Sequence, residues 1–209
     1  MGNEELKSIV YVKIDNSNRI IDINSNVFLS DTSDWAEIDE GVGDKYTLCQ
    51  SNYFDGGVYT SDGIPRYKLA DNKAVERTEE EINADRLAPS KSEKVAKSKS
   101  DLKTYLATHP LTWTDGKQYN ITDEKTGWLT SKVVAATAAA GIGVPYNLKW
   151  NDTGMVCEEW SLSDLTALAL AIDERVTSLV TYQQVKEIEI NAAQTMAELD
   201  AIVVDYDEV

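Results

Sequence analysis

The chain has 209 residues, of which 42% are hydrophobic, so it can bury the core of one medium-sized domain or two small ones. Acidic residues outnumber basic ones by 36 to 20, and the net charge of −16 argues against surfaces that bind nucleic acid or anionic membranes. No apolar run approaches the roughly 18 residues that insert across a bilayer, and the N-terminus lacks the pattern of a signal peptide.

Residues 1–77 are predicted to form a small β-rich domain. β-branched and aromatic residues at 9–14 and 19–23 predict two strands, which a hairpin through Asn16–Asn18 joins. Apolar and acidic residues alternate at 35–39, which is typical of a half-buried strand. Further short elements are expected: a helix around 44–53 and strands near 58–59, 67–69 and 74–76.

Residues 78–103 are predicted to be a charged helical connector. Thr78 and Glu81 form the pattern of a capping box, which starts a helix. Pro89 is expected to end or kink that helix, because it lacks an N–H and restricts the residue before it. The stretch 91–103 carries five of the 20 basic residues and almost no bulky apolar ones, so we expect a solvated segment and a domain boundary here.

Residues 104–209 are predicted to form an α+β domain of two hairpins packed on helices. The first hairpin spans 112–119, with Asp115 and Gly116 in a type I′ turn. A helix should follow from Thr122 to about Ala140 and stop at Gly141. The second hairpin covers 146–160 and turns at 151–154. The predicted fold class of the whole chain is therefore α+β.

Two helices are predicted in the C-terminal part of this domain. Ser161 and Asp164 form a capping pattern before a helix that runs to about residue 190. Its core-facing stripe is expected to consist of Leu165, Leu168, Ile172, Val176 and Leu179. A last short helix should begin at Thr195, and the acidic tail Asp205–Glu208 is expected to be a solvated end.

Candidate reactive residues are few, and each has a structural interpretation. Glu158 and Glu159 sit on a predicted strand, so their side chains point to opposite faces and are poorly placed for joint acid–base chemistry. The single histidine, His109, has no nearby cysteine or second histidine to share a metal and is expected to contact the last carbonyls of a helix. Cys49 and Cys157 are predicted to be buried or half-buried free thiols in a reducing compartment.

Two glycine- or acid-containing segments also fail as binding motifs. Residues 22–26 resemble the start of a calcium loop but lack its glycine and its final glutamate. Gly141 and Gly143 follow a predicted helix, whereas a phosphate loop precedes one, so they are interpreted as a helix stop. We therefore predict no catalytic, cofactor-binding or metal-binding residues and no enzymatic activity.

The tryptophans allow two interpretations. Four of the five lie close together in sequence, namely Trp113, Trp128, Trp150 and Trp160. They could form a compact core, because these rings bury a large area, or they could be exposed and stack on sugar rings of a surface glycan. The core interpretation is the preferred one.

Several blocks of the second half resemble a known family. They are 109–113 (HPLTW), 115–119 (DGKQY), 143–151 (GVPYNLKWN), 157–161 (CEEWS), 182–184 (YQQ) and 198–202 (ELDAI). Together they are similar to C-terminal domains of unknown function in tail-fibre and tail-associated proteins of tailed bacteriophages and prophages. Residues 35–41, 44–46 and 75–81 resemble N-terminal regions of small phage tail proteins. No catalytic residues are established for this family, so the resemblance assigns none to this chain.

The resemblance implies a role in the virion or in its assembly, and the leading hypothesis is a non-enzymatic structural protein of the phage tail, in the fibre or baseplate apparatus. Such a protein would be assembled in the host bacterial cytoplasm, reside in the virion, and dock as an oligomer to other tail, fibre or baseplate proteins. The alternative is a tail-fibre assembly chaperone that is not retained in the virion. A third hypothesis is a module that binds host-surface glycans.

Overall fold

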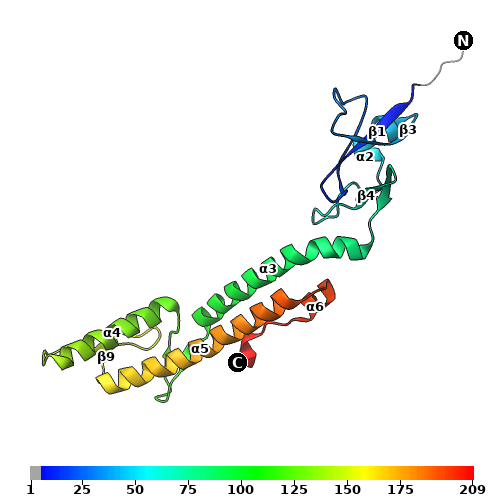
Figure 1. Ribbon diagram of the computed structural model, residues 1–209. Coiled ribbons are helices and arrows are strands. Elements are labelled where there is room, and N and C mark those ends of the chain that lie inside the picture. The colour runs from blue at the N-terminus through cyan, green and yellow to red at the C-terminus, as the bar shows by residue number, and fades with distance from the viewer. Residues whose placement is uncertain (1–5) are drawn as a thin grey trace, which may run out of the picture. The chain divides into compact units, whose positions relative to one another are not determined.

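The computed structural model describes residues 6–209, and its helices and antiparallel sheets confirm the α+β class (Figure 1). The chain divides into two compact units, residues 1–89 and 90–209. Within the described part of the chain, every helix is too short or too polar to cross a bilayer.

A three-stranded antiparallel sheet forms the centre of the first unit. Its strands are β1 (Ser8–Ile14), β2 (Ile20–Ser25) and β3 (Ala36–Gly41), in the order β2-β1-β3. The predicted hairpin between β1 and β2 is confirmed, and Asn18 takes a positive φ of 59° in its turn. Asparagine tolerates this backbone conformation better than most residues, which explains its place there.

One face of this sheet is covered by short elements that complete the unit's core. They are α1 (Asp44–Thr47), α2 (Cys49–Asn52), β4 (Tyr67–Ala70) and β5 (Lys73–Glu76). The fully enclosed side chains are Val10, Val12, Ile20, Ile23 and Cys49. The strand expected at 58–59 is wrong, since Tyr59 makes only an isolated bridge with Pro65.

Helix α3 (Glu79–Thr108) begins as predicted. The backbone N–H of Thr78 donates to Glu81 Oε2 at 3.0 Å, and the Glu81 N–H donates to Thr78 Oγ1 at 3.3 Å, which completes the capping box. Pro89 does not end the helix, because α3 continues for another 19 residues beyond it. Proline removes one backbone hydrogen bond from a helix interior, and the rest of this long helix retains its own.

The segment expected to be a separate connector, residues 78–103, is divided between the two units at Pro89. Its lysines are not simply solvated. Lys91 Nζ donates to the carbonyl of Asn191 and Lys94 Nζ to that of Leu199, in both cases near the carboxyl end of a helix. Cations stabilise helix C-termini through such carbonyls, so these lysines fasten α3 to the C-terminal part of the chain.

The second unit is built around helix α5 (Leu162–Ala192). The C-terminal part of α3 runs antiparallel to one half of α5, and α4 (Asp123–Gly141) runs antiparallel to the other half (Figure 1). The caps predicted at Thr122, Ser161 and Thr195 are all confirmed, the last at the start of α6 (Met196–Ala201). The predicted stripe of α5 is confirmed too, with four of its side chains buried and Val176 packed against them.

Two short hairpins close the core of this unit, as predicted. β6 (Leu111–Thr112) pairs with β7 (Gln118–Tyr119), and β8 (Lys149–Trp150) pairs with β9 (Glu158–Glu159). The expected type I′ turn in the first hairpin is wrong, because only Gly116 has a positive φ, at 77°. The Gly116 N–H donates to the Trp113 carbonyl, and the Asp115 side chain accepts from the Lys117 N–H. This is a longer loop with glycine at its left-handed position.

The C-terminal tail is not a solvated end. It forms a short 3₁₀ helix, Tyr206–Glu208, in which Tyr206 is only 5% exposed. The Tyr206 hydroxyl donates to the Ser98 carbonyl at 2.8 Å, and burial raises the pKa of Tyr206 to about 12. Ser98 also accepts a hydrogen bond from the buried Gln183 of α5. The tail therefore closes a polar contact between α3 and α5.

Helix α4 stops at a different glycine from the one expected. Gly141 is its last helical residue, and Gly143 takes the positive φ of 69°. The N–H of Gly143 donates to the Ala140 carbonyl and that of Val144 to the Ala139 carbonyl, which is a Schellman motif. Glycine is needed at position 143 because a side chain is disfavoured in this conformation.

Two alanine substitutions test this assignment. Gly143→Ala should destabilise the protein by about 1–2 kcal/mol, the cost of placing an alanine in the left-handed region. Gly141→Ala, where a Cβ meets no atom within 4 Å, should stabilise it by up to about 1 kcal/mol through helix propensity. Urea unfolding of both variants measures the difference, and equal effects would contradict the assignment.

Candidate interaction surface

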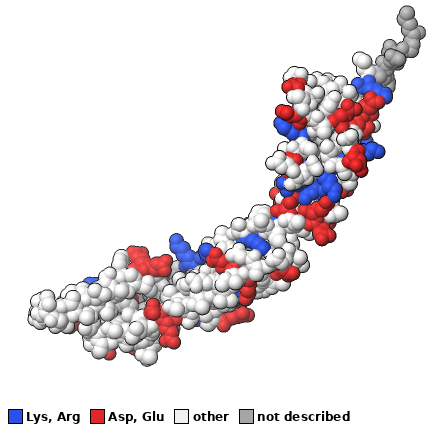
Figure 2. Space-filling model, in the orientation of Figure 1, with Lys and Arg blue, Asp and Glu red and all other residues white. Residues whose placement is uncertain are grey.

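After its first two residues, Asp123 and Glu124, helix α4 lies in the longest acid-free stretch of the chain. Between Glu124 and Asp152 there is no acidic residue, and the only charged residues are Lys125, Lys132 and Lys149. Figure 2 shows few charged side chains over the end of the second unit where α4 lies. In a protein of net charge −16, this is an exceptional region.

One half of α4 packs inward and the other half is exposed. Leu129 and Ala136 are buried against the core that α5 lines, and Val133 packs beside them. The opposite half of the helix forms what we call the α4 surface. It begins after the first turn, which carries the exposed acids Asp123 and Glu124, and its residues are Gly127, Trp128, Thr130, Ser131, Val134, Thr137, Ala138, Gly141 and Ile142.

The large apolar side chains of the α4 surface are well exposed. Trp128 is 53% exposed, Val134 61% and Ile142 77%. Val144 and Tyr146, in the loop that follows, are exposed as well. Exposed apolar side chains that gather in one place mark interaction sites more often than single ones do.

The hydroxyl groups of the α4 surface are already hydrogen-bonded within the helix. Thr130 donates to the carbonyl of Thr126, Ser131 to that of Gly127 and Thr137 to that of Val133, at 2.8–2.9 Å. Burying a hydroxyl without a partner is costly, whereas these hydroxyls keep their partners when another protein covers them. The hydroxyl groups of the surface can therefore be buried together with its apolar side chains at low cost.

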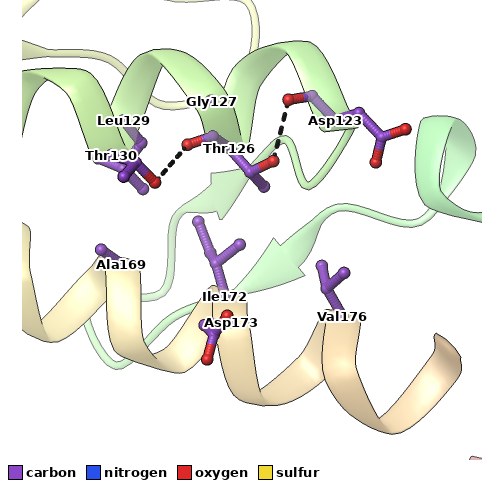
Figure 3. Close-up of a pocket in the computed structure, with 9 residues that line it drawn as sticks. All are labelled: Asp123, Thr126, Gly127, Leu129, Thr130, Ala169, Ile172, Asp173 and Val176. Atoms are coloured by element: carbon purple, nitrogen blue, oxygen red, sulfur yellow. Dashed lines mark hydrogen bonds between the residues drawn. The ribbon is translucent and has the colours of Figure 1, made fainter. Parts of the chain in front are cut away.

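A groove of about 380 Å³ runs along one side of the α4 surface, between α4 and α5 (Figure 3). In the close-up, Ile172 and Val176 of α5 point toward α4, while the Asp173 carboxylate points away from it. Gly127 and Thr130 line both the groove and the α4 surface. The two features therefore form one continuous area.

The tryptophans divide between core and surface. Trp150 is 6% exposed, and Trp113 and Trp160 pack on the core with ring centroids 5.6 Å apart. The core interpretation is confirmed for these three. It is wrong for Trp128, whose ring lies on the α4 surface with Lys125 Nζ 4.9 Å from its centroid.

Each candidate reactive residue has a structural setting of its own. His109 is exposed, stacks on Tyr105 and hydrogen-bonds through Nδ1 to the Tyr105 carbonyl, as expected for a residue at a helix end. Glu158 and Glu159 are both exposed. Within residues 6–209, no three histidine, cysteine or acidic side chains gather where they could hold a metal ion.

The two cysteines differ. Cys49 is buried, and burial raises the pKa of its thiol to about 11. Cys157 is exposed, which corrects the expectation that both would be buried or half-buried. It follows β8 and the turn of the second hairpin, and that two-residue ladder is too short to enclose it.

Other titratable groups with shifted pKa values take part in structural contacts. Burial and a hydrogen bond to Asp115 raise the pKa of Tyr119, and burial and a hydrogen bond to Asp39 raise that of Tyr53. Two hydrogen bonds from the Arg86 guanidinium lower the pKa of the Asp62 carboxyl. Each of these pKa shifts comes with a hydrogen bond that holds a loop or hairpin in place.

Comparison with protein-family models, with curated proteins and with solved structures gives no match to this chain. The α4 surface is thus identified from its own chemistry. Motif analysis missed it because none of its residues is reactive; the signal in the sequence is the long interval between Glu124 and Asp152 without an acid.

Proposed function

We propose that this protein is a non-enzymatic structural component of the tail of a tailed bacteriophage or prophage. It would belong to the fibre or baseplate apparatus, be made in the host bacterial cytoplasm and remain in the virion. Its partners would be other tail, fibre or baseplate proteins. The resemblance of residues 101–209 to tail-associated domains is the starting point of this proposal.

The observation that carries the docking role is the α4 surface. It lies in the half of the chain that the resemblance covers, and it exposes Trp128, Val134 and Ile142 on a folded helix. Its hydroxyls need no water once covered, because they donate to backbone carbonyls. A surface of this kind favours burial against another protein over contact with solvent.

Mass spectrometry of purified particles from the phage or induced prophage that encodes the chain tests the proposal. We expect the chain in particles at a fixed ratio to the known tail proteins. Abundance in the lysate together with absence from particles would overturn the structural role and support the assembly chaperone. A host cytoplasmic protein of similar abundance, followed through the same purification, controls for carry-over.

A further inference from the structure

The distribution of charge narrows the choice of partner for the α4 surface. Two copies of a protein that each carry −16 repel one another over most of their surfaces. That repulsion is weakest where neither copy presents an acid, and the stretch from Lys125 to Asn151 is the longest of that kind. At physiological salt, charges more than about 8 Å away are largely screened, so the local composition of a contact matters most.

A basic partner would be drawn elsewhere on the molecule. The only carboxylates of α4 are those of Asp123 and Glu124 in its first turn, and the rest of the α4 surface offers none to a cation, whereas acids are spread over most of the remaining sequence. Lys125 is already placed over the ring of Trp128. The partner that fits is therefore one whose own contact face is uncharged and apolar, with small side chains that permit close approach.

The same face on a second copy meets these conditions. We propose that the α4 surface is the contact between two copies of this chain, packed around a two-fold axis so that α4 of one copy lies against α4 of the other. This inference rests on the proposed function and names the first partner of its docking surface. In an antiparallel pair the two helix dipoles oppose each other, and Val134, near the middle of α4, lies close to the axis.

Sedimentation velocity of the full chain at about 0.05 M and 0.5 M salt tests the proposal. We expect a monomer–dimer equilibrium that shifts toward dimer at high salt, because screening weakens the repulsion between the acidic copies while the apolar contact persists. Val134→Glu should weaken the dimer by at least ~10-fold, because it places two carboxylates at the axis. Ala138→Glu, at another exposed position of the same face, should act in the same direction.

Ile188→Glu is the matched control. Ile188 is 70% exposed on α5, is β-branched like Val134 and takes the same charge, but it lies near the end of α5 that packs against α3. It should leave the dimer unchanged. Circular dichroism of each variant shows that the fold is retained, which we expect because all three positions are exposed.

Three results would overturn the inference: a chain that stays monomeric at both salts, a dimer that weakens as salt increases, or equal effects of Val134→Glu and Ile188→Glu. The test of the dimer and the test of the proposed function can fail independently. A monomer that is nevertheless found in particles overturns only the contact between copies, and a dimer that is absent from particles overturns only the structural role.

Discussion

Trp150→Ala should cost the second unit about 3–5 kcal/mol of stability, the range for truncation of a large buried ring. Trp150 is 6% exposed and belongs to the cluster that joins the hairpins to α4 and α5. The rings of Trp113, Tyr119 and Trp160 belong to the same cluster and already pack on one another, so we expect them to stay in place rather than fill the space. Thermal unfolding of the full chain should show the transition lowered by roughly 10 °C or more.

Trp128→Ala is the control for this result. The Trp128 ring is 53% exposed on the α4 surface, so its removal should change stability by no more than about 0.5 kcal/mol. If the two substitutions had equal effects on unfolding, the division of the tryptophans between core and surface would be wrong.

Asp85→Asn should strongly destabilise the first unit. Asp85 Oδ2 accepts from Arg77 and lies 2.7 Å from both Arg77 Nη2 and Arg19 Nη1. The Arg77 side chain is 6% exposed and also donates to the carbonyls of Pro65 and Glu81. Without the carboxylate the buried guanidinium loses its counter-charge, so we expect a loss of about 2–3 kcal/mol.

Asp101→Asn supplies the comparison, because Asp101 lies on the same helix and pairs with Lys97 at the exposed surface. Exposed pairs of this type contribute at most about 0.5 kcal/mol. Chemical unfolding of both variants should therefore separate them clearly. A loss for Asp85→Asn as small as that for Asp101→Asn would show that Arg77 is adequately held by its two carbonyl partners.

The elements that local chemistry determines were predictable from the sequence. The hairpin of β1 and β2 and the caps at Thr78, Thr122, Ser161 and Thr195 depend on residues a few positions apart, and all are present. The stripe on α5 was predictable for the same reason, since its period is that of the helix itself.

Features that depend on distant residues were not predictable. Tyr206 is held by Ser98, 108 positions away, and Lys94 by Leu199, 105 positions away. A lysine-rich or acidic segment is ordinarily solvated, so neither contact has a sequence signal. The stop of α4 was missed by two residues because either Gly141 or Gly143 satisfies the glycine rule and only the backbone decides between them.

The α4 surface was hidden from sequence reasoning for a different reason. Small and apolar residues occur all round this helix, so periodicity does not reveal which face is buried. The buried face of α4 is determined by the packing of Leu129 and Ala136 against α5, which leaves Val134 exposed. Once that face is known, the lack of acids around it becomes meaningful.

The most direct test of the account follows the incorporation of variants into particles. Quantitative mass spectrometry should compare particles assembled with the wild-type chain, with Val134→Glu and with Ile188→Glu. We predict that the wild-type chain and Ile188→Glu are incorporated equally and that Val134→Glu is reduced by at least ~10-fold, because a carboxylate must then be buried in the docking surface. Incorporation of Val134→Glu at the wild-type level would contradict docking through the α4 surface.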